Sequence, residues 1–170
     1  MPAYLLDVNV WVAAAFPAHP AHHNAQAVLL EATPAAPALF CRATQQSFLR
    51  LVSTPAIFSA YRSDPITNRD ALNALAAFAA LPQVDQMDEP SGLEPLWWRL
   101  AGLAEVAPKR WMDAYLAAFA ISGSLRLISL DRDFRQFVEA GLDLVLLQAD
   151  AGKGADAIAP APSPARRLPG

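Results

Sequence analysis

The sequence predicts an α/β protein, a three-layer α/β/α sandwich around a central, mainly parallel sheet of about four to five strands. The first observation is a series of short apolar segments without polar alternation, which is typical of strands buried on both faces of a parallel sheet. The second is that these segments alternate with longer ones of helical periodicity. Such strands are joined by right-handed crossovers, so their carboxyl ends share one edge of the sheet.

The length of the chain favours a single domain. Its 170 residues suffice for one well-buried core and leave little room for a second. We place this domain at 1–148. The remainder, 149–170, is rich in Ala, Pro and Gly and buries too little apolar area to order itself, so we predict a disordered tail.

Composition limits the partners and the compartment. The net charge is −3, so a nucleic acid must be held by a local patch, and ten of the 13 basic residues lie between Arg42 and Arg135. The single cysteine excludes an intrachain disulfide and favours a reducing compartment. The longest uninterrupted apolar stretch, 114–121, is too short to cross a bilayer. We expect a cytoplasmic protein without a membrane partner.

The first strand is predicted at 3–6, and it ends at Asp7. Asn9 suits the N-cap of a helix expected at 10–16, which leaves Asp7 free for a functional role. Ligands of open α/β sheets bind at the carboxyl ends of the strands, where Asp7 is expected.

The next elements are a helix at 22–32, a strand at 38–40 and a helix at 43–52. Three histidines near the first of these helices have no Cys or carboxylate at ligand spacing, so we do not expect them to bind a metal. In the helix at 43–52, Gln45 shares an inward stripe with Phe48 and Val52. A buried amide needs a hydrogen-bonding partner, so Gln45 is either a structural residue or part of a polar cavity.

The middle of the chain carries mostly structural signals. We expect a loop at 53–65, then a helix capped by Thr67 that buries Leu72 and Leu75 and stops at Pro82. A short strand at 83–87 precedes an amphipathic, aromatic-rich helix from Leu93, whose apolar side we assign to the core or to a dimer surface.

Two more acids accompany the last elements. A helix at 108–122 is apolar almost all round after Asp113, and a buried strand at 125–130 ends in Asp131 and Asp133. A short helix and a strand at 142–147 follow. Asp7 and Asp131 both follow strands, and a helix that starts at the same edge brings Asp113 to it. Acids gathered without a basic partner repel, so the cluster predicts a bound cation, and hard oxygen ligands select Mg²⁺ or Mn²⁺.

Three segments together resemble the acidic motifs of PIN-domain ribonucleases, and most closely those of VapC toxins. They are Leu5-Leu6-Asp7-Val8-Asn9, Asp113-Ala114-Tyr115-Leu116 and Ser129-Leu130-Asp131-Arg132-Asp133. The resemblance implies a PIN-like fold and a Mg²⁺- or Mn²⁺-dependent endoribonuclease that acts on structured RNA such as tRNA. It also implies a homodimer neutralised by a VapB-type antitoxin.

The resemblance assigns Asp7, Asp113 and Asp131 as the metal-binding and catalytic acids, with Asn9 and Asp133 in supporting roles. The family usually has a Glu in the helix at 43–52, and Gln45 is interpreted as its replacement. Gln45 can hold a water through its carbonyl oxygen but adds no charge, so we expect weaker metal affinity and one ion rather than two. Arg50, one turn later, is either a phosphate contact for RNA or a solvated surface residue.

Two alternatives stay open. A haloacid dehalogenase-like phosphatase also has an Asp after its first strand and a later Asp-x-Asp, but Asn9 stands where its second acid belongs. The other is a PIN-like binding module without catalysis, because Gln45 weakens the site.

Overall fold

The computed structural model describes residues 2–151, and in this part of the chain five parallel strands form one sheet. The strand order is β3-β2-β1-β4-β5, and every neighbouring pair is parallel. The strands are β1 (Tyr4–Leu6), β2 (Ala38–Phe40), β3 (Val84–Gln86), β4 (Arg126–Ser129) and β5 (Asp143–Leu146). The predicted α/β fold is therefore confirmed, and the first strand lies at the centre of the sheet.

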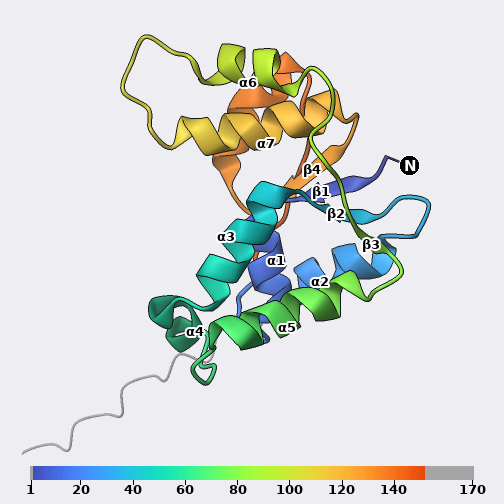
Figure 1. Ribbon diagram of the computed structural model, residues 1–170, viewed down its shortest axis with the longest axis vertical. Helices are drawn as coiled ribbons and strands as arrows, with labels where there is room; N and C mark the ends of the chain where they lie inside the picture. Colours follow the sequence, from blue (N-terminus) through green and yellow to red (C-terminus); the bar gives the residue numbers. More distant parts are fainter. Residues whose placement is uncertain (1, 152–170) are drawn as a thin grey trace, which may run out of the picture.

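Helices cover both faces of this sheet (Figure 1). One layer contains α1 (Val8–Ala15), α2 (His22–Glu31), α3 (Arg42–Val52), α4 (Pro55–Ala60) and α5 (Asn68–Ala79). The other contains α6 (Leu93–Ala101), α7 (Arg110–Ser122) and the 3₁₀ helix η1 (Arg132–Ala140). Tyr4 and Leu6 pack into the first layer and Leu5 into the second, so β1 is buried on both sides. No helix of the described residues is long and apolar enough to span a membrane.

The start of α1 differs from the prediction. The helix begins at Val8, and Asp7 is its N-cap: the backbone N–H of Val8 donates to Asp7 Oδ1 at 2.7 Å. Asn9, which we expected in that role, lies inside the first turn. Asp7 is thus both a helix cap and a residue of the sheet edge.

The segment expected to be a loop at 53–65 contains a short helix, α4. Pro55 occupies the first turn of α4, where a missing N–H costs nothing. The buried face of the next helix, α5, also differs from the predicted one. Ala71 is buried, whereas Leu72, which we expected in the core, is 56% exposed.

The predicted tail lies outside the described residues except for 149–151. Within that short part, Asp150 binds the start of α2. Its carboxylate accepts hydrogen bonds from the backbone N–H groups of His23 and Asn24, each at 2.9 Å.

Candidate active site

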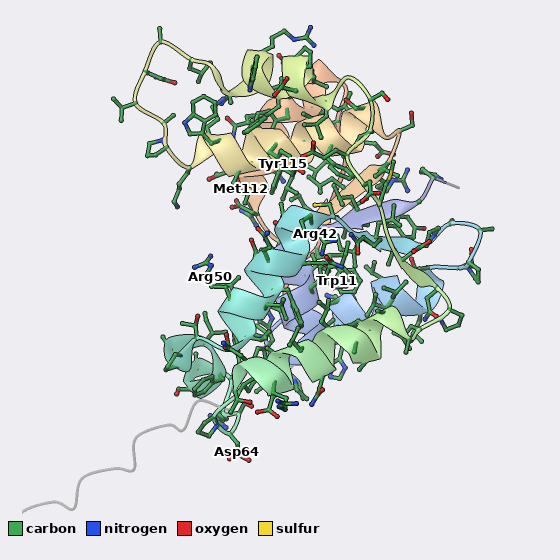
Figure 2. All side chains as sticks on the ribbon, viewed as in Figure 1. Trp11, Arg42, Arg50, Asp64, Met112 and Tyr115 are labelled. Atoms are coloured by element: carbon green, nitrogen blue, oxygen red, sulfur yellow. The ribbon has the colours of Figure 1, made fainter. Side chains whose placement is uncertain are left out.

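The structure brings three of the predicted acids into one cavity at the carboxyl edge of the sheet. Asp7 comes from the end of β1, Asp113 from the first turn of α7, and Asp131 from the residues after β4. The cavity has a volume of about 210 Å³. Its other lining residues are Val8, Asn9, Ala43, Thr44, Ser47, Met112 and Leu116. Figure 2 shows Met112, one of these lining residues, on the side of α7 that is nearest to α3.

Asp7 is the most buried of these acids, with 6% of its surface exposed. Burial raises its pKa to about 6, and the nearby charges of Asp113 and Asp131 act in the same direction. Hydrogen bonds from the Ser129 hydroxyl and the Val8 N–H offset part of this effect. No Lys, Arg or His of residues 2–151 forms a salt bridge with Asp7. The site therefore holds a desolvated carboxylate whose charge no basic side chain of the described chain neutralises.

Asn9 and Ser129 fix the position of the Asp7 side chain. The Asn9 amide and the Ser129 hydroxyl each donate to Asp7 Oδ2 at 2.7 Å. Asn9 Oδ1 accepts from the backbone N–H of Leu130 at 3.1 Å, and Ser129 Oγ accepts from the N–H of Asp131 at 2.9 Å. This network joins the ends of β1 and β4 and sets the spacing of the two acids.

Ser129 is a residue that the sequence analysis did not select. It is fully buried and looked like an ordinary strand position. The available signal was its place in the motif, two residues before Asp131 and facing the same edge as Asp7.

Asp113 is half-buried at the rim of the cavity. Desolvation raises the pKa of its carboxyl group, and the charges of Asp131 and Asp133 raise it further. Lys109 and Arg110 lower this pKa in part. Asp113 accepts no hydrogen bond from any residue that the structure describes, so both of its oxygens are free to bind a ligand.

Asp131 and Asp133 play different parts. Asp131 caps η1 and lines the cavity, and its Oδ1 accepts from the N–H of Asp133 at 2.9 Å. Asp133 does not line the cavity, and its charge acts on Asp113 from outside.

Gln45 is not brought into the site, contrary to our expectation. It is held at the other side of α3, where its Oε1 accepts from Arg42 at 2.7 Å and its amide donates to Gln86 at 2.9 Å. The buried stripe of α3 is Thr44, Phe48 and Val52: Phe48 and Val52 are as predicted, and Thr44 takes the place expected for Gln45. From α3, Thr44 and Ser47 line the cavity instead, so this helix contributes two hydroxyl side chains rather than the amide of Gln45.

Arg50 lies on the same helix, one turn beyond Ser47. Its side chain is exposed and forms no hydrogen bond or salt bridge with residues 2–151. It does not line the acidic cavity.

The donor set fits a hard divalent cation bound with water. Asp7 Oδ1 accepts one hydrogen bond and keeps a free lone pair, and Asp131 Oδ2 accepts none from the described chain. Within residues 2–151, no three His, Cys, Asp or Glu side chains lie close enough together to hold an ion on their own. Mg²⁺ typically binds one or two carboxylates and keeps several waters, so a complete protein cage is not required.

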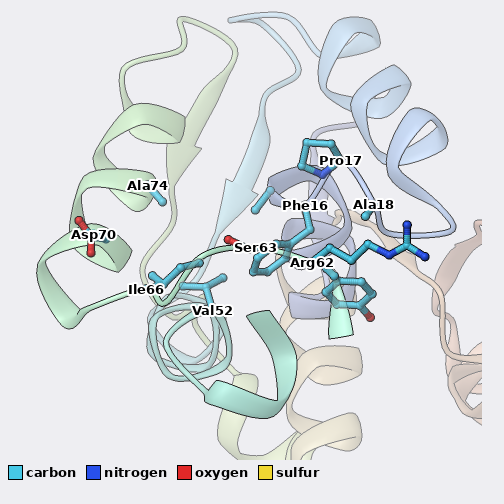
Figure 3. Close-up of a pocket in the computed structure, with 11 residues that line it drawn as sticks. Phe16, Pro17, Ala18, Val52, Arg62, Ser63, Ile66, Asp70 and Ala74 are labelled. Carbon is cyan, nitrogen blue, oxygen red and sulfur yellow. The ribbon is translucent and has the colours of Figure 1, made fainter. Parts of the chain in front are cut away.

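A second cavity, of about 390 Å³, lies away from the acids, among the ends of α1 and α3, the segment that follows α4, and α5 (Figure 3). Its wall is mainly apolar, with Phe16, Pro17, Val52 and Ile66, and Arg62 lies at one side. Its lining offers one acid, Asp70, which lies in the first turn of α5 and accepts from the N–H of the N-cap residue Thr67. This cavity lacks the convergent polar groups of a catalytic site.

The fold and the cavity together define a class: three-layer α/β proteins with a carboxylate cluster at the carboxyl edge of a parallel sheet. The chain belongs to the PIN-domain family, among its VapC-type ribonucleases, since the family model described as PIN domain matches residues 4–140. The phosphatase alternative is therefore set aside.

The curated relatives cover most of the chain. Ribonuclease VapC41 of Mycobacterium tuberculosis is 44% identical over 145 residues, which span 84% of this chain and 97% of the relative. Ribonuclease VapC48 of the same organism is 31% identical over 134 residues, 77% of this chain and 89% of the relative.

Solved structures share the fold at much lower identity. VapBC2 from Rickettsia felis, bound to a DNA fragment from its promoter, aligns with a TM-score of 0.55 and 16% identity, covering 86% of this chain and 99% of that chain. VapC20 of Mycobacterium tuberculosis, described as a toxin that cleaves the sarcin-ricin loop, also aligns with a TM-score of 0.55 and 16% identity. The alignment covers 82% of this chain and 96% of that chain.

Proposed function

We propose that this chain is the toxin of a type II toxin–antitoxin pair and that it hydrolyses RNA phosphodiester bonds as a Mg²⁺- or Mn²⁺-dependent endoribonuclease. The supporting observation is the convergence of Asp7, Asp113 and Asp131 in one cavity, where Asp7 is desolvated and forms no salt bridge with any basic side chain of residues 2–151. Membership in the family of ribonucleases VapC41 and VapC48 supports RNA as the substrate.

In this proposal Asp7, Asp113 and Asp131 hold the ion and catalyse the reaction. A bound Mg²⁺ or Mn²⁺ supplies Lewis acidity at the phosphate and lowers the pKa of an attacking water. Asn9 and Ser129 orient Asp7 so that Oδ1 keeps a free lone pair toward the cavity. Asp133 adds negative charge beside Asp113 and favours retention of the cation.

The partner proposals follow from the relatives and from one exposed patch. An antitoxin of the VapB type is supported by the VapBC2 complex, and structured RNA such as tRNA by the family resemblance. For a homodimer, the supporting feature is the exposed apolar stretch from α6 to α7, where Val106 is 97% exposed. It also includes Trp98, Leu103, Trp111 and Met112.

The dimer proposal is tested by sedimentation velocity. Val106→Asp places a charge in the exposed apolar stretch and is expected to shift the protein toward a monomer. Val138→Asp, at another exposed apolar position, is the control and is expected to leave the sedimentation coefficient unchanged.

The activity is tested by incubating the purified chain with bulk tRNA in Mn²⁺ and in EDTA. We expect defined fragments in Mn²⁺ only. RNA binding without cleavage would instead favour the alternative of a PIN-like module without catalysis.

A further inference from the structure

A cavity between α3 and α5 has no part in the proposed chemistry. Its volume is about 320 Å³, and it is lined by Leu49, Arg50, Ser53, Asn68, Ala71 and Leu72. Leu72 presents an exposed apolar surface, 56% accessible, although an α5 stripe that followed the sequence pattern would have buried it. The cavity therefore combines an apolar wall with a rim of one cation, one hydroxyl and one amide.

This cavity is connected to the acidic site through a single helix. Ser47 lines the acidic cavity and Arg50 lines this one, and residues three apart on a helix are surface neighbours, with Cβ atoms about 5–6 Å apart. In Figure 2 the Arg50 side chain extends from α3 on the same side of the molecule as Met112, which borders the acids. The two cavities thus succeed one another along one exposed side of α3.

The polar groups of this rim are available for a ligand. Neither the Arg50 guanidinium nor the Asn68 amide bonds to another side chain or backbone group of residues 2–151. The Ser53 hydroxyl donates to the carbonyl of Leu49 at 2.7 Å, and its oxygen can still accept. A free guanidinium suits bidentate contact with phosphate better than any other side chain.

RNA that reaches a site with several carboxylates needs cations nearby. On the α7 side, the positive charge of Lys109 lowers the pKa of Asp113. The Arg110 guanidinium already donates hydrogen bonds to the carbonyl of Leu100 and to the side chain of Gln136. Arg50 supplies a cation on the α3 side that does not line the acidic cavity and is not among the charges that act on Asp113, whereas Lys109 is. This separation fits a phosphate next to the one that is cut, rather than the reacting phosphate itself.

We propose that the α3–α5 cavity binds an unpaired nucleotide adjacent to the scissile bond, with Arg50 on its phosphate, its base against Leu72, and Ser53 and Asn68 at the base edge. This inference rests on the proposed ribonuclease function and adds a substrate requirement. A base inside a duplex is stacked and paired and cannot enter the cavity, so the substrate must offer a loop or single strand beside the cut.

The first test is steady-state cleavage of bulk tRNA in Mn²⁺. Arg50→Ala and Leu72→Asp are each expected to raise KM about tenfold, about 1.4 kcal/mol, with kcat changed less than about twofold. Arg42→Ala removes the same charge from the same helix, and Leu30→Asp adds the same charge at another exposed leucine. Both controls should match the unsubstituted protein.

The second test measures binding by fluorescence anisotropy, using a short unpaired RNA and the same RNA annealed to its complement. We expect tighter binding of the unpaired form. In Arg50→Ala, the affinity for this RNA should fall less steeply with salt concentration, by an amount that corresponds to about one phosphate contact. Failure of the chain to cleave any RNA, with this Arg50-dependent binding intact, would overturn the proposed function and leave the nucleotide site standing.

Three results would overturn the nucleotide site. Arg50→Ala and Leu72→Asp could cleave and bind like their controls. Arg50→Ala could lower kcat at unchanged KM, which would place Arg50 at the reacting phosphate. Either substitution could leave RNA cleavage unchanged but weaken inhibition by an antitoxin peptide, which would make the cavity a peptide site.

Discussion

Replacing Asp7 by Asn should make the metal-free protein more stable at neutral pH. The pKa of Asp7 is raised to about 6 from an ordinary 3.8, so keeping this buried carboxylate ionised at pH 8 costs about 3 kcal/mol of folding free energy. Asn is an equally good N-cap, so the contact with the Val8 N–H survives. The amide nitrogen of the new Asn then stands where Oδ2 accepts from the Asn9 amide and from the Ser129 hydroxyl. The hydroxyl can rotate and accept instead, so one donor–donor conflict, with Asn9, replaces a hydrogen bond and costs about 1 kcal/mol.

The net gain is therefore about 2 kcal/mol, which raises Tm by roughly 4–8 °C for a domain of this size. The folded protein binds the extra proton between pH 4 and 6, so its stability falls as pH rises through that interval and the penalty is complete above it. The advantage of Asp7→Asn should accordingly be largest at pH 8 and fade toward pH 4.

The assay is thermal unfolding by circular dichroism in EDTA at pH 4, 6 and 8, repeated with Mn²⁺. Asp64→Asn, at an exposed acid far from the cavity (Figure 2), is the control and should leave Tm unchanged at every pH. Saturating Mn²⁺ should stabilise the unsubstituted protein and not Asp7→Asn. An Asp7→Asn variant whose Tm in EDTA is equal or lower at pH 8 would refute the buried-acid reasoning.

Three further results are expected. Ser47→Glu adds a carboxylate to the cavity and should raise Mn²⁺ affinity about tenfold by calorimetry, whereas Gln45→Glu, outside the cavity, should not change it. Ser129→Ala removes the hydroxyl that lowers the pKa of Asp7, so half-maximal Mn²⁺ binding should move to higher pH and unfolding should become easier by about 1–3 kcal/mol. In the unsubstituted protein Mn²⁺ affinity should rise as pH passes about 6, because the ion competes with the proton on Asp7, and a flat profile would contradict this assignment.

The parallel sheet was predictable because its strands are short, apolar and regularly separated by helical segments. The burial of Leu5 on one face and Leu6 on the other is what such a run implies. The helix at Pro55 was not predictable from the same rules, because proline breaks a helix in its interior but favours it in the first turn.

The convergence of Asp7 and Asp131 was predictable because parallel topology alone brings the ends of β1 and β4 together. The roles of Asn9 and Gln45 depended on details that topology does not set. The helix α1 begins two residues earlier than predicted, so Asn9 joins the ends of β1 and β4 instead of capping the helix. In the buried stripe of α3, Thr44 takes the place expected for Gln45, and Gln45 lies outside the site. Periodicity locates a helical face only to within about one residue, which is the precision that a binding site requires.

The central claim is that Asp7, Asp113 and Asp131 together hold one divalent ion that RNA cleavage requires. The most direct measurement compares cleavage of bulk tRNA by the unsubstituted chain, Asp113→Asn and Asp64→Asn, each in Mn²⁺ and in EDTA. We predict fragments only in Mn²⁺, a loss of at least about 100-fold in rate for Asp113→Asn, and full activity for Asp64→Asn. Cleavage that persists in EDTA, or that Asp113→Asn retains, would contradict the account.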